Sequence, residues 1–415
     1  MCYTQNRFNA LLSASVLSLV ATVAWSQSLT WLGTLSGYRS EARGVSADGS
    51  VVVGLVFYDD YDPFRRPYER AFRWTVDGGM QDLGTLGGDW SVAWGVSADG
   101  AVVVGTARNA AGYGHAFRWT ALGGMQDLGT LGNTWSLAHG VSADGAVVVG
   151  YAYNAAFQWR AFRWTASGGM QDLGTLPGGR ESGAFGVSAD GAVVVGWADN
   201  AAGLWRAFRW TASGGMQELG TLPGYDRSDA NAVSADGAVV VGRAFNGIGS
   251  RAFRWTAAGG MQDLGTLPGY DSSSVAYGVS ADGAVVVGWA ENARQRRAFR
   301  WTASGGMENL NTTYASLLTD GSELWEARAI SPNGRYIVGA GYNAATGRSW
   351  EAFLLDTGSP RRGDVDRNGC VDDADLLQVL FAFGGPGYRN EDLNWDGTVD
   401  DADLLQVLFN FGSGC

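Results

Sequence analysis

Residues 95–106 read Gly-Val-Ser-Ala-Asp-Gly-Ala-Val-Val-Val-Gly-Thr, and this stretch decides the fold. Two short apolar runs flank an Asp-Gly pair, which is the turn chemistry that a tight β-hairpin needs. The valine triplet at 102–104 is apolar on both faces, as expected of a strand whose sheet is packed between two neighbours. The stretch therefore predicts a buried hairpin.

The same hexapeptide recurs along the chain. Gly-Val-Ser-Ala-Asp-Gly begins at Gly44, Gly95, Gly140, Gly186 and Gly278, and weaker copies begin at Ala232 and Ala329. The turn Asp, or Asn in the last copy, stands at 48, 99, 144, 190, 236, 282 and 333, a step of 45 to 51 residues. This period is typical of a four-stranded propeller blade.

Each repeat divides into four strand-like pieces, which in the second repeat are 92–97, 101–106, 115–120 and 125–131. They are too short and too rich in valine and aromatic residues for helices, so we expect an all-β fold. The chain begins with a fourth-strand sequence at 29–35, and its last repeat ends with a third strand at 352–356. The prediction is a seven-bladed β-propeller over residues 27–357, in which the N-terminal strand closes the last blade.

The repeat resembles the HAF-repeat family of extracellular proteins, named for a His-Ala-Phe triplet. Residues 115–120, His-Ala-Phe-Arg-Trp-Thr, carry the triplet intact, and Asp-Leu-Gly-Thr-Leu follows at 127–131. The other copies keep Ala-Phe, mostly with arginine in place of the histidine. The resemblance implies secretion and repetition, but no defined activity.

Two polar positions of the repeat are interpreted as structural. The Asp of Ser-Ala-Asp-Gly is a turn residue, since the last copy keeps the turn with Asn. If Thr75 pairs with Met80, Arg73 lies opposite Asp82, and a cross-strand ion pair is expected. The same register predicts pairs Arg118–Asp127, Arg163–Asp172, Arg209–Glu218 and Arg254–Asp263.

The connections that vary between repeats all lie at one end of the predicted propeller, which is therefore the candidate ligand face. Its aromatic residues include Tyr58, Tyr61, Trp90, Trp135, Trp159, Trp205, Tyr225 and Tyr270. Aromatic rings stack on the apolar faces of sugars, although these residues could equally pack the loops. An enzymatic site would need two converging carboxylates, for which Asp226, Asp229, Asp271 and Glu326 are available.

After a linker at 358–363, residues 364–415 contain two twelve-residue calcium-loop patterns of the EF-hand type, each followed by a helical segment. The first offers Asp364, Asp366, Asn368, Cys370 (through its carbonyl), Asp372 and Asp375, and the second offers Asp392, Asn394, Asp396, Thr398, Asp400 and Asp403. Hard oxygen ligands in this number predict two bound Ca²⁺ ions.

The duplicated loop and helix resemble a type I dockerin module, which implies a cohesin-like or other cell-surface partner. The chain departs from that family where each loop ends in Asp-Ala-Asp, at positions often used for partner choice. Because the two ends of such a module tend to meet, we expect a disulfide between Cys370 and Cys415.

The N-terminal segment indicates where the protein is located, and its charge and histidine content exclude classes of partner and site. Residues 1–26, with Arg7 before an apolar run, are typical of a secretory signal peptide, and no later run is long enough to span a membrane. A net charge of −12 argues against nucleic acid as a partner. Only two histidines occur, which argues against histidine-based triads and zinc sites.

The sequence thus predicts a secreted, non-catalytic binding or scaffolding protein, extracellular or at the cell surface. Its propeller would bind a polysaccharide or a protein, and its dockerin-like tail would attach it through calcium. The alternative is a carbohydrate-active enzyme, a glycoside hydrolase or lyase, tethered by its dockerin. A purely structural surface protein is a third interpretation.

Overall fold

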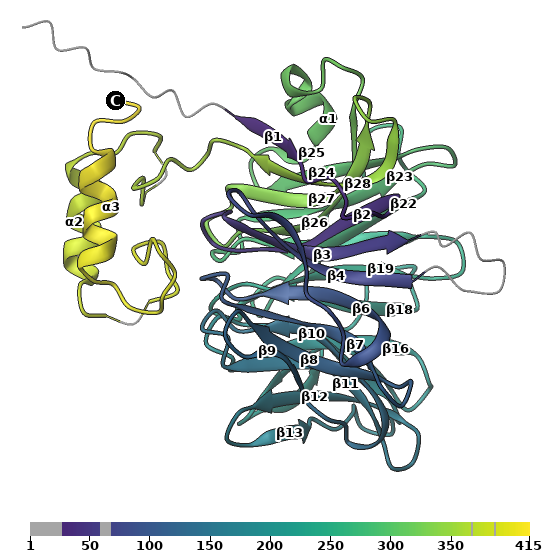
Figure 1. Cartoon of the computed structure of the whole chain (residues 1–415). Coiled ribbons are helices and arrows are strands. Elements are labelled where there is room, and N and C mark those ends of the chain that lie inside the picture. The colour runs from purple at the N-terminus through teal and green to yellow at the C-terminus, as the bar shows by residue number, and fades with distance from the viewer. Residues whose placement is uncertain (1–26, 59–67, 367, 386) are drawn as a thin grey trace, which may run out of the picture.

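The structure is a computed structural model that describes residues 27–58, 68–366, 368–385 and 387–415. Seven four-stranded antiparallel sheets stand side by side as the blades of a β-propeller (Figure 1). The all-β prediction and the count of seven blades are therefore confirmed. The expected signal peptide and the candidate ligand residue Tyr61 lie outside the described residues.

Blades 1 to 6 each take four strands in chain order, from the innermost outwards. Blade 1 contains β2 (Arg39–Val45), β3 (Val51–Tyr58), β4 (Tyr68–Thr75) and β5 (Gly79–Asp82). Blade 2 contains β6 (Gly87–Val96), β7 (Val102–Asn109), β8 (Gly114–Thr120) and β9 (Gly124–Asp127). Blade 3 contains β10 (Gly132–Val141), β11 (Val147–Asn154), β12 (Trp159–Thr165) and β13 (Gly169–Asp172).

The next three blades follow the same plan. Blade 4 contains β14 (Ser182–Val187), β15 (Val193–Asp199), β16 (Trp205–Thr211) and β17 (Gly215–Glu218). Blade 5 contains β18 (Arg227–Val233), β19 (Val239–Phe245), β20 (Ser250–Thr256) and β21 (Gly260–Asp263). Blade 6 contains β22 (Ser273–Val279), β23 (Val285–Glu291), β24 (Arg296–Thr302) and β25 (Gly306–Asn309), and the short helices α1 (Leu310–Thr313) and η1 (Ala315–Leu317) follow it.

Blade 7 combines the two ends of the propeller. It contains β26 (Glu323–Ile330), β27 (Tyr336–Asn343), β28 (Arg348–Asp356) and, as its outermost strand, β1 (Ser28–Trp31). β1 pairs antiparallel with β28, so that Ser28 lies opposite Asp356 and Trp31 opposite Phe353. The predicted closure of the last blade by the N-terminal strand is therefore confirmed.

A buried serine joins each of blades 1 to 6 to the preceding blade. The Ser91 hydroxyl donates to the Gly84 carbonyl (2.6 Å) and accepts from the Ala71 backbone N–H (3.0 Å). At the ring closure the Ser40 hydroxyl accepts from the Ala352 N–H (2.9 Å). The same role falls to Ser136, Ser182, Ser228 and Ser274. The closing junction is thus bonded like the internal ones.

The hairpin between the third and fourth strands of a blade is one residue out of the predicted register. Thr75 pairs with Gly79 across a three-residue turn, because Gly79 adopts the positive φ (62°) that ends such a turn. Arg73 therefore lies opposite Gln81, and the predicted pairing of Arg73 with Asp82 is wrong. A slip of one residue places the two side chains on opposite faces of the sheet.

These arginines still join neighbouring blades, but through a backbone carbonyl. Arg163 Nε donates to the Gly191 carbonyl (3.1 Å), in the Ser-Ala-Asp-Gly turn of the next blade. The equivalent bonds are Arg118–Gly145, Arg209–Gly237 and Arg254–Gly283, in place of the carboxylate pairs predicted for these three residues. The fourth-strand acids pair instead with the residue before Ala-Phe, in Arg70–Asp82, His115–Asp127, Arg160–Asp172 and Arg206–Glu218.

Residues 364–415 form a small helical unit around the two loop sequences. α2 (Asp373–Ala382) and α3 (Asp401–Asn410) each begin with a capping box and lie side by side (Figure 1). Five buried valines form their common core: Val365, Val371, Val379, Val399 and Val407. Within the described part of the chain, no helix is long and apolar enough to cross a membrane.

The helical unit contacts one end of the propeller. This end carries the Ser-Ala-Asp-Gly turns, and we call it the turn face. Trp395, from the second loop of the helical unit, is only 3% exposed and packs against turn alanines that include Ala47, Ala98 and Ala281. The contact therefore places an indole ring on the axis of the propeller.

Candidate functional site

A channel runs between the innermost strands of the seven blades. Near the turn face it is lined by alanines of the Ser-Ala-Asp-Gly turns and by valines such as Val96 and Val141, and Trp395 lies at this end. The opposite end carries the variable connections, and we call it the loop face. There the channel widens into a cavity of about 630 Å³, which we call the channel pocket.

Each innermost strand has a β-bulge at the same place. In β10 the pairing with β11 skips from Ala138 to Gly140, so that His139 is the extra residue. A bulge changes the direction of a side chain, and here it provides one channel-lining residue from each blade. We call these seven the ring residues: Arg43, Trp94, His139, Phe185, Asn231, Tyr277 and Arg328.

The ring residues differ between blades although the sequence beside them hardly changes. Each directly precedes Gly-Val-Ser-Ala-Asp-Gly or its variant, and only arginine occurs twice among the seven. A purely structural role would be met by the same side chain in every blade, so the variation indicates a role in binding. The sequence-based prediction looked for variation only in the loops and missed these residues. Aligning the seven repeats at the position before the hexapeptide would have revealed them.

Blades 2 to 4 give one side of the channel pocket an aromatic lining. The His139 ring lies 4.8 Å from Trp94 between centroids and stacks on Tyr151 at 5.2 Å. Nearby, Trp205 stacks on Trp197 at 4.3 Å. Tyr151 and Trp197 occupy a second varied position, directly after Val-Val-Val-Gly. These rings offer flat apolar surfaces of the kind that stack on sugar rings.

Blades 1 and 7 give the other side of the pocket its positive charge. Arg43 forms an ion pair with Glu41, and Arg328 forms one with Glu326. The Arg328 guanidinium also lies over the Tyr277 ring, 4.3 Å from its centroid. Both arginines line the channel pocket whereas the two glutamates do not, so the guanidinium groups are what a ligand would meet.

The electrostatic surroundings of Arg43 reflect this crowding of like charges. Burial and the neighbouring Arg328 lower the pKa of Arg43, and the charges of Glu41 and Glu326 act in the opposite direction. The two glutamates therefore compensate for the placing of two guanidinium groups at the junction of the first and last blades.

Four nitrogen atoms of the ring residues are buried without a hydrogen-bond partner among the described residues. They are Arg43 Nε, Arg328 Nε, Trp94 Nε1 and His139 Nε2. A buried polar group that lacks a partner costs about 1–3 kcal/mol, so such groups are rare and call for an explanation. All four residues line the same pocket, which makes oxygen atoms of a ligand candidate partners for them.

His139 is held neutral in this setting. Burial, with a smaller contribution from the charge of Arg43, lowers the pKa of His139 to about 3. A neutral imidazole can donate or accept a hydrogen bond, and it stacks on aromatic neighbours without a charge to desolvate.

The structure distributes the described aromatic residues predicted for the ligand face over three settings. Trp159 and Trp205 line the channel pocket. Tyr58, Tyr225 and Tyr270 pack against the cores of blades. Trp90 lies beside Arg108, whose Cζ atom is 5.7 Å from its ring centroid, and Trp135 lies against Gly114, where an added Cβ would come within 2.4 Å of the indole ring.

Of the four carboxylates considered for an enzymatic site, only Asp229 lines the channel pocket. It forms an ion pair with Arg243 at 3.0 Å. Glu326 is fully buried and is paired with both Arg296 and Arg328. Asp226 and Asp271 are not among the lining residues. The structure therefore does not bring a pair from this set together in the pocket.

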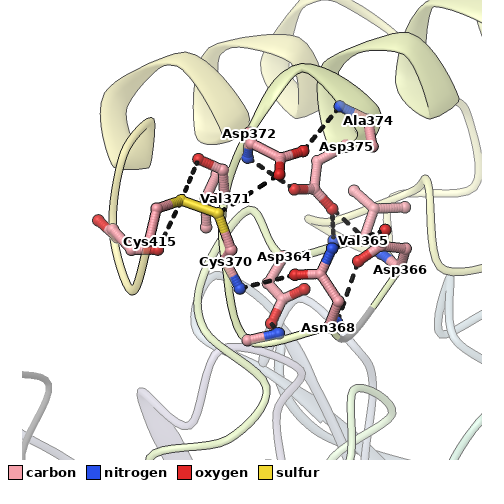
Figure 2. The surroundings of a disulfide bond; sticks show 12 residues. Asp364, Val365, Asp366, Asn368, Cys370, Val371, Asp372, Ala374, Asp375 and Cys415 are labelled. Atoms are coloured by element: carbon pink, nitrogen blue, oxygen red, sulfur yellow. Dashed lines mark hydrogen bonds between the residues drawn. A yellow bond between two sulfur atoms is a disulfide. The ribbon is translucent and has the colours of Figure 1, made fainter.

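The first calcium-loop sequence folds into a cluster of carboxylates. Asp364, Asp366 and Asp375 bring one ligand atom each to within 4.8 Å of one another (Figure 2). Asp375 is fully buried and accepts hydrogen bonds from the backbone N–H groups of Val365 (2.7 Å) and Asp366 (3.1 Å). Carboxylates this close repel one another unless a cation lies between them, so the cluster fits Ca²⁺.

The second loop repeats the hydrogen bonds that the last aspartate of the first loop accepts from the backbone. Asp392 and Asp403 are both fully buried, and Asp403 accepts from the backbone N–H of Leu393 at 2.7 Å. Burial, together with the nearby Asp403 and Asp396 carboxylates, raises the pKa of Asp392 to about 6. This donor set also fits Ca²⁺.

A disulfide bond closes the helical unit. Cys370, in the first loop, is bonded to Cys415, and their Cα atoms lie 4.8 Å apart (Figure 2). The Cys370 backbone N–H donates to the Asn368 side chain at 2.7 Å, which holds the loop in its turn. The disulfide leaves the carbonyl of Cys370 as the ligand that this position offers.

Comparisons with known proteins agree on the fold alone. No protein-family model and no curated protein matches the chain. Among solved structures, an oligogalacturonate lyase in complex with manganese has a TM-score of 0.50 and 11% identity, covering 79% of this chain and 92% of its own. TolB from Acinetobacter baumannii has a TM-score of 0.43 and 12% identity, covering 75% and 81%.

A third solved structure is the β-propeller domain of the trilobed protease from Pyrococcus furiosus. It has a TM-score of 0.48 and 10% identity, and the match covers 78% of this chain and 95% of that one. At 11% identity, the likeness to the lyase shows the propeller fold alone.

Proposed function

We propose that the chain is a secreted binding protein that holds a glycan in the channel pocket and is attached to a partner by its calcium-loaded helical unit. The observation that carries the proposal is the set of seven ring residues. Nearly identical blades present almost seven different side chains to one pocket, which a scaffold alone does not require.

The chemistry of the pocket favours a glycan over an apolar ligand. Its aromatic side, with Trp159, Trp197 and Trp205, offers stacking surfaces, and its unpartnered nitrogen donors require oxygen acceptors. Sugars combine apolar ring faces with many hydroxyl oxygens. Pockets of this size also suit small ligands or the end of a chain.

The attachment part of the proposal rests on an exposed apolar surface. Phe381 of α2 and Phe409 of α3 are 85% and 82% exposed, and they occupy equivalent positions of the two helices. Further exposed members are Leu377, Leu380, Phe383, Leu405, Leu408 and Phe411. An apolar surface of this kind suits a protein partner, and calcium would hold the two helices in the arrangement that presents it.

Glycan binding is tested with the purified propeller-containing chain on a glycan array, followed by calorimetry on the oligosaccharides that bind. Trp205→Ala removes a stacking surface of the pocket and is expected to weaken binding roughly tenfold. Trp90→Ala is the matched control, since Trp90 lies on the loop face but outside the pocket. Equal effects of the two substitutions would argue against the pocket as the binding site.

The same oligosaccharides test the non-catalytic part of the proposal. Prolonged incubation followed by mass spectrometry should return each one unchanged. Cleavage, by hydrolysis or by elimination, would favour the tethered carbohydrate-active enzyme instead.

Attachment is tested by calorimetry with a type I cohesin domain in calcium and in EDTA. We expect binding only in calcium, and loss of binding in the double variant Phe381→Ser/Phe409→Ser. Leu122→Ser is the control, because Leu122 is a fully exposed residue of the propeller. If no cohesin binds, the attachment part of the proposal is wrong, whereas the glycan part stands.

A further inference from the structure

We infer that the channel pocket selects sugars that carry an acidic group, and that Arg43 and Arg328 bind this group where the first and last blades meet. The inference rests on the proposed glycan binding and specifies the class of glycan that the pocket binds. It concerns carboxylate or sulfate groups, both of which present several oxygen acceptors to a guanidinium.

The charge that faces the pocket supports an anionic ligand. Three arginines line it, Arg43, Arg243 and Arg328, against two carboxylates, Glu181 and Asp229. Asp229 is already paired with Arg243, 3.0 Å away. The remaining guanidinium groups, on Arg43 and Arg328, lie on neighbouring blades and have their counter-charges outside the pocket lining.

The hydrogen-bonding state of these arginines points in the same direction. Each gives one terminal nitrogen to its glutamate and keeps a buried Nε without a partner among the described residues. Trp94 Nε1 is likewise unpartnered, and Trp94 packs beneath the guanidinium of Arg43. Three donors with no acceptor, two of them on cations, match an oxyanion better than a hydroxyl group, which brings its own proton.

The two sides of the pocket then have separate roles. The acidic group would lie at Arg43 and Arg328, while the sugar ring extends towards the aromatic side formed by blades 2 to 4. Glu41 and Glu326 hold the guanidinium groups in place, because a charged group that is fixed before binding loses less entropy when the ligand arrives.

The test compares acidic oligosaccharides with neutral counterparts of the same ring structure. One arm uses trigalacturonic acid and its fully methyl-esterified form, and the other uses a sulfated galactose oligomer and its desulfated form. By calorimetry we expect the acidic member of at least one pair to bind roughly tenfold more tightly, and the preference to shrink at high salt. Equal binding of both members in both pairs would overturn the inference and leave glycan binding intact.

If the protein binds no member of either pair and nothing on the glycan array, the proposed function is wrong, and the inference fails with it.

The contribution of a single residue is tested with Arg328→Met. This residue is chosen because Glu326 keeps Arg296 as its counter-ion and is not left as an unpaired buried charge. We expect this variant to lose the acidic preference, so that it binds the two members of the pair with similar affinity.

Arg108→Met is the matched control, since Arg108 forms an ion pair with Asp89 on the loop face, outside the pocket. It should keep the preference of the unmodified protein. An unchanged preference in folded Arg328→Met would overturn the assignment. If that variant does not fold, the comparison of ester and acid on the unmodified protein still decides the inference.

Discussion

The Arg43 guanidinium lies over the indole ring of Trp94, with its Cζ atom 4.8 Å from the ring centroid. The two residues occupy the same bulge position in β2 and β6, the innermost strands of neighbouring blades. Their contact therefore connects the charged side of the channel pocket with its aromatic side. A cation over an aromatic face contributes about 0.5–2 kcal/mol, more where water is excluded.

Replacing Trp94 should affect ligand binding more than folding. Trp94→Leu removes both the surface beneath Arg43 and the Nε1 donor, so we expect glycan affinity to fall roughly tenfold or more. The melting temperature should change little, because the bulge position accepts seven residues of very different size. Calorimetry and thermal melting measure the two effects, with Trp90→Leu as the control. A large loss of stability with unchanged affinity would assign Trp94 to the scaffold instead.

The corrected hairpin register has a measurable consequence. Arg160 lies near Asp172, with Nε 3.6 Å from Oδ2, whereas Arg163 donates to a backbone carbonyl of the next blade. A double-mutant cycle of Arg160→Met with Asp172→Asn should give a coupling energy of about 0.2–1 kcal/mol, as expected of a partly exposed pair. The cycle of Arg163→Met with Asp172→Asn should give none. Coupling in the second cycle only would restore the register predicted from the sequence.

Arg163→Met alone should still destabilise the protein, by about 1 kcal/mol, because the Gly191 carbonyl loses its donor. Urea unfolding measures this difference. The substitution therefore separates two ideas that the sequence could not distinguish, namely a link to a carboxylate within the blade and a link to the neighbouring blade.

The propeller architecture could be predicted from the sequence because it depends on the positions of the turns. Asp-Gly pairs at a regular step specify where each hairpin reverses, and the fourth-strand sequence at 29–35 has no partner unless the ring closes. The register of the hairpin between the third and fourth strands was harder to predict, since Gly78 and Gly79 are adjacent and either could adopt the positive φ. In the structure Gly79 adopts it.

The pocket was the part of the structure that was hardest to predict from the sequence. Strict alternation along a strand predicts which face a residue occupies, but an extra residue at a bulge breaks that alternation. Nothing in the residues around His139, for example, marks a bulge between Ala138 and Gly140. Variation between the repeats was the available signal, and it was read from the loops, where Trp159 and Trp205 happened to border the same pocket.

The depressed pKa of His139 makes stability depend on pH. Its pKa is about 3 in the folded protein against 6.5 ordinarily, so below pH 6.5 the unfolded chain takes up a proton that the folded chain does not. The stability present above pH 6.5 is therefore lost as pH falls towards 3, by at most about 1.4 kcal/mol per pH unit. Urea unfolding at several pH values in this window measures the slope.

His139→Phe isolates this contribution, because Phe185 shows that the bulge position accepts phenylalanine. The variant should lose less stability than the unmodified protein across the same window, since the carboxylates titrate alike in both. His115→Arg is the control, as arginine occupies the equivalent position in five of the other blades and the pairing with Asp127 can persist. Parallel pH profiles for His139→Phe and the unmodified protein would contradict the buried neutral state.

Calcium should control the position of Trp395. This residue lies between Asn394 and Asp396, two of the expected ligands, and it is buried against the turn face of the propeller. Removing calcium leaves the loop carboxylates to repel one another, so we expect the helical unit to unfold in EDTA, the indole ring to leave the channel, and the propeller to stay folded. The fluorescence difference between the unmodified protein and Trp395→Phe reports this residue alone among 18 tryptophans.

In calcium the difference spectrum should be that of a buried indole, and EDTA should shift it to longer wavelength. Trp395→Ala should have a second effect, because the contact with the turn alanines holds the helical unit against the propeller. In calcium, the linker at 358–363 should become more susceptible to proteolysis in this variant while both parts remain folded. A difference spectrum that is unchanged by EDTA, together with equal proteolysis of both proteins, would mean that the second loop is held by the propeller and not by calcium.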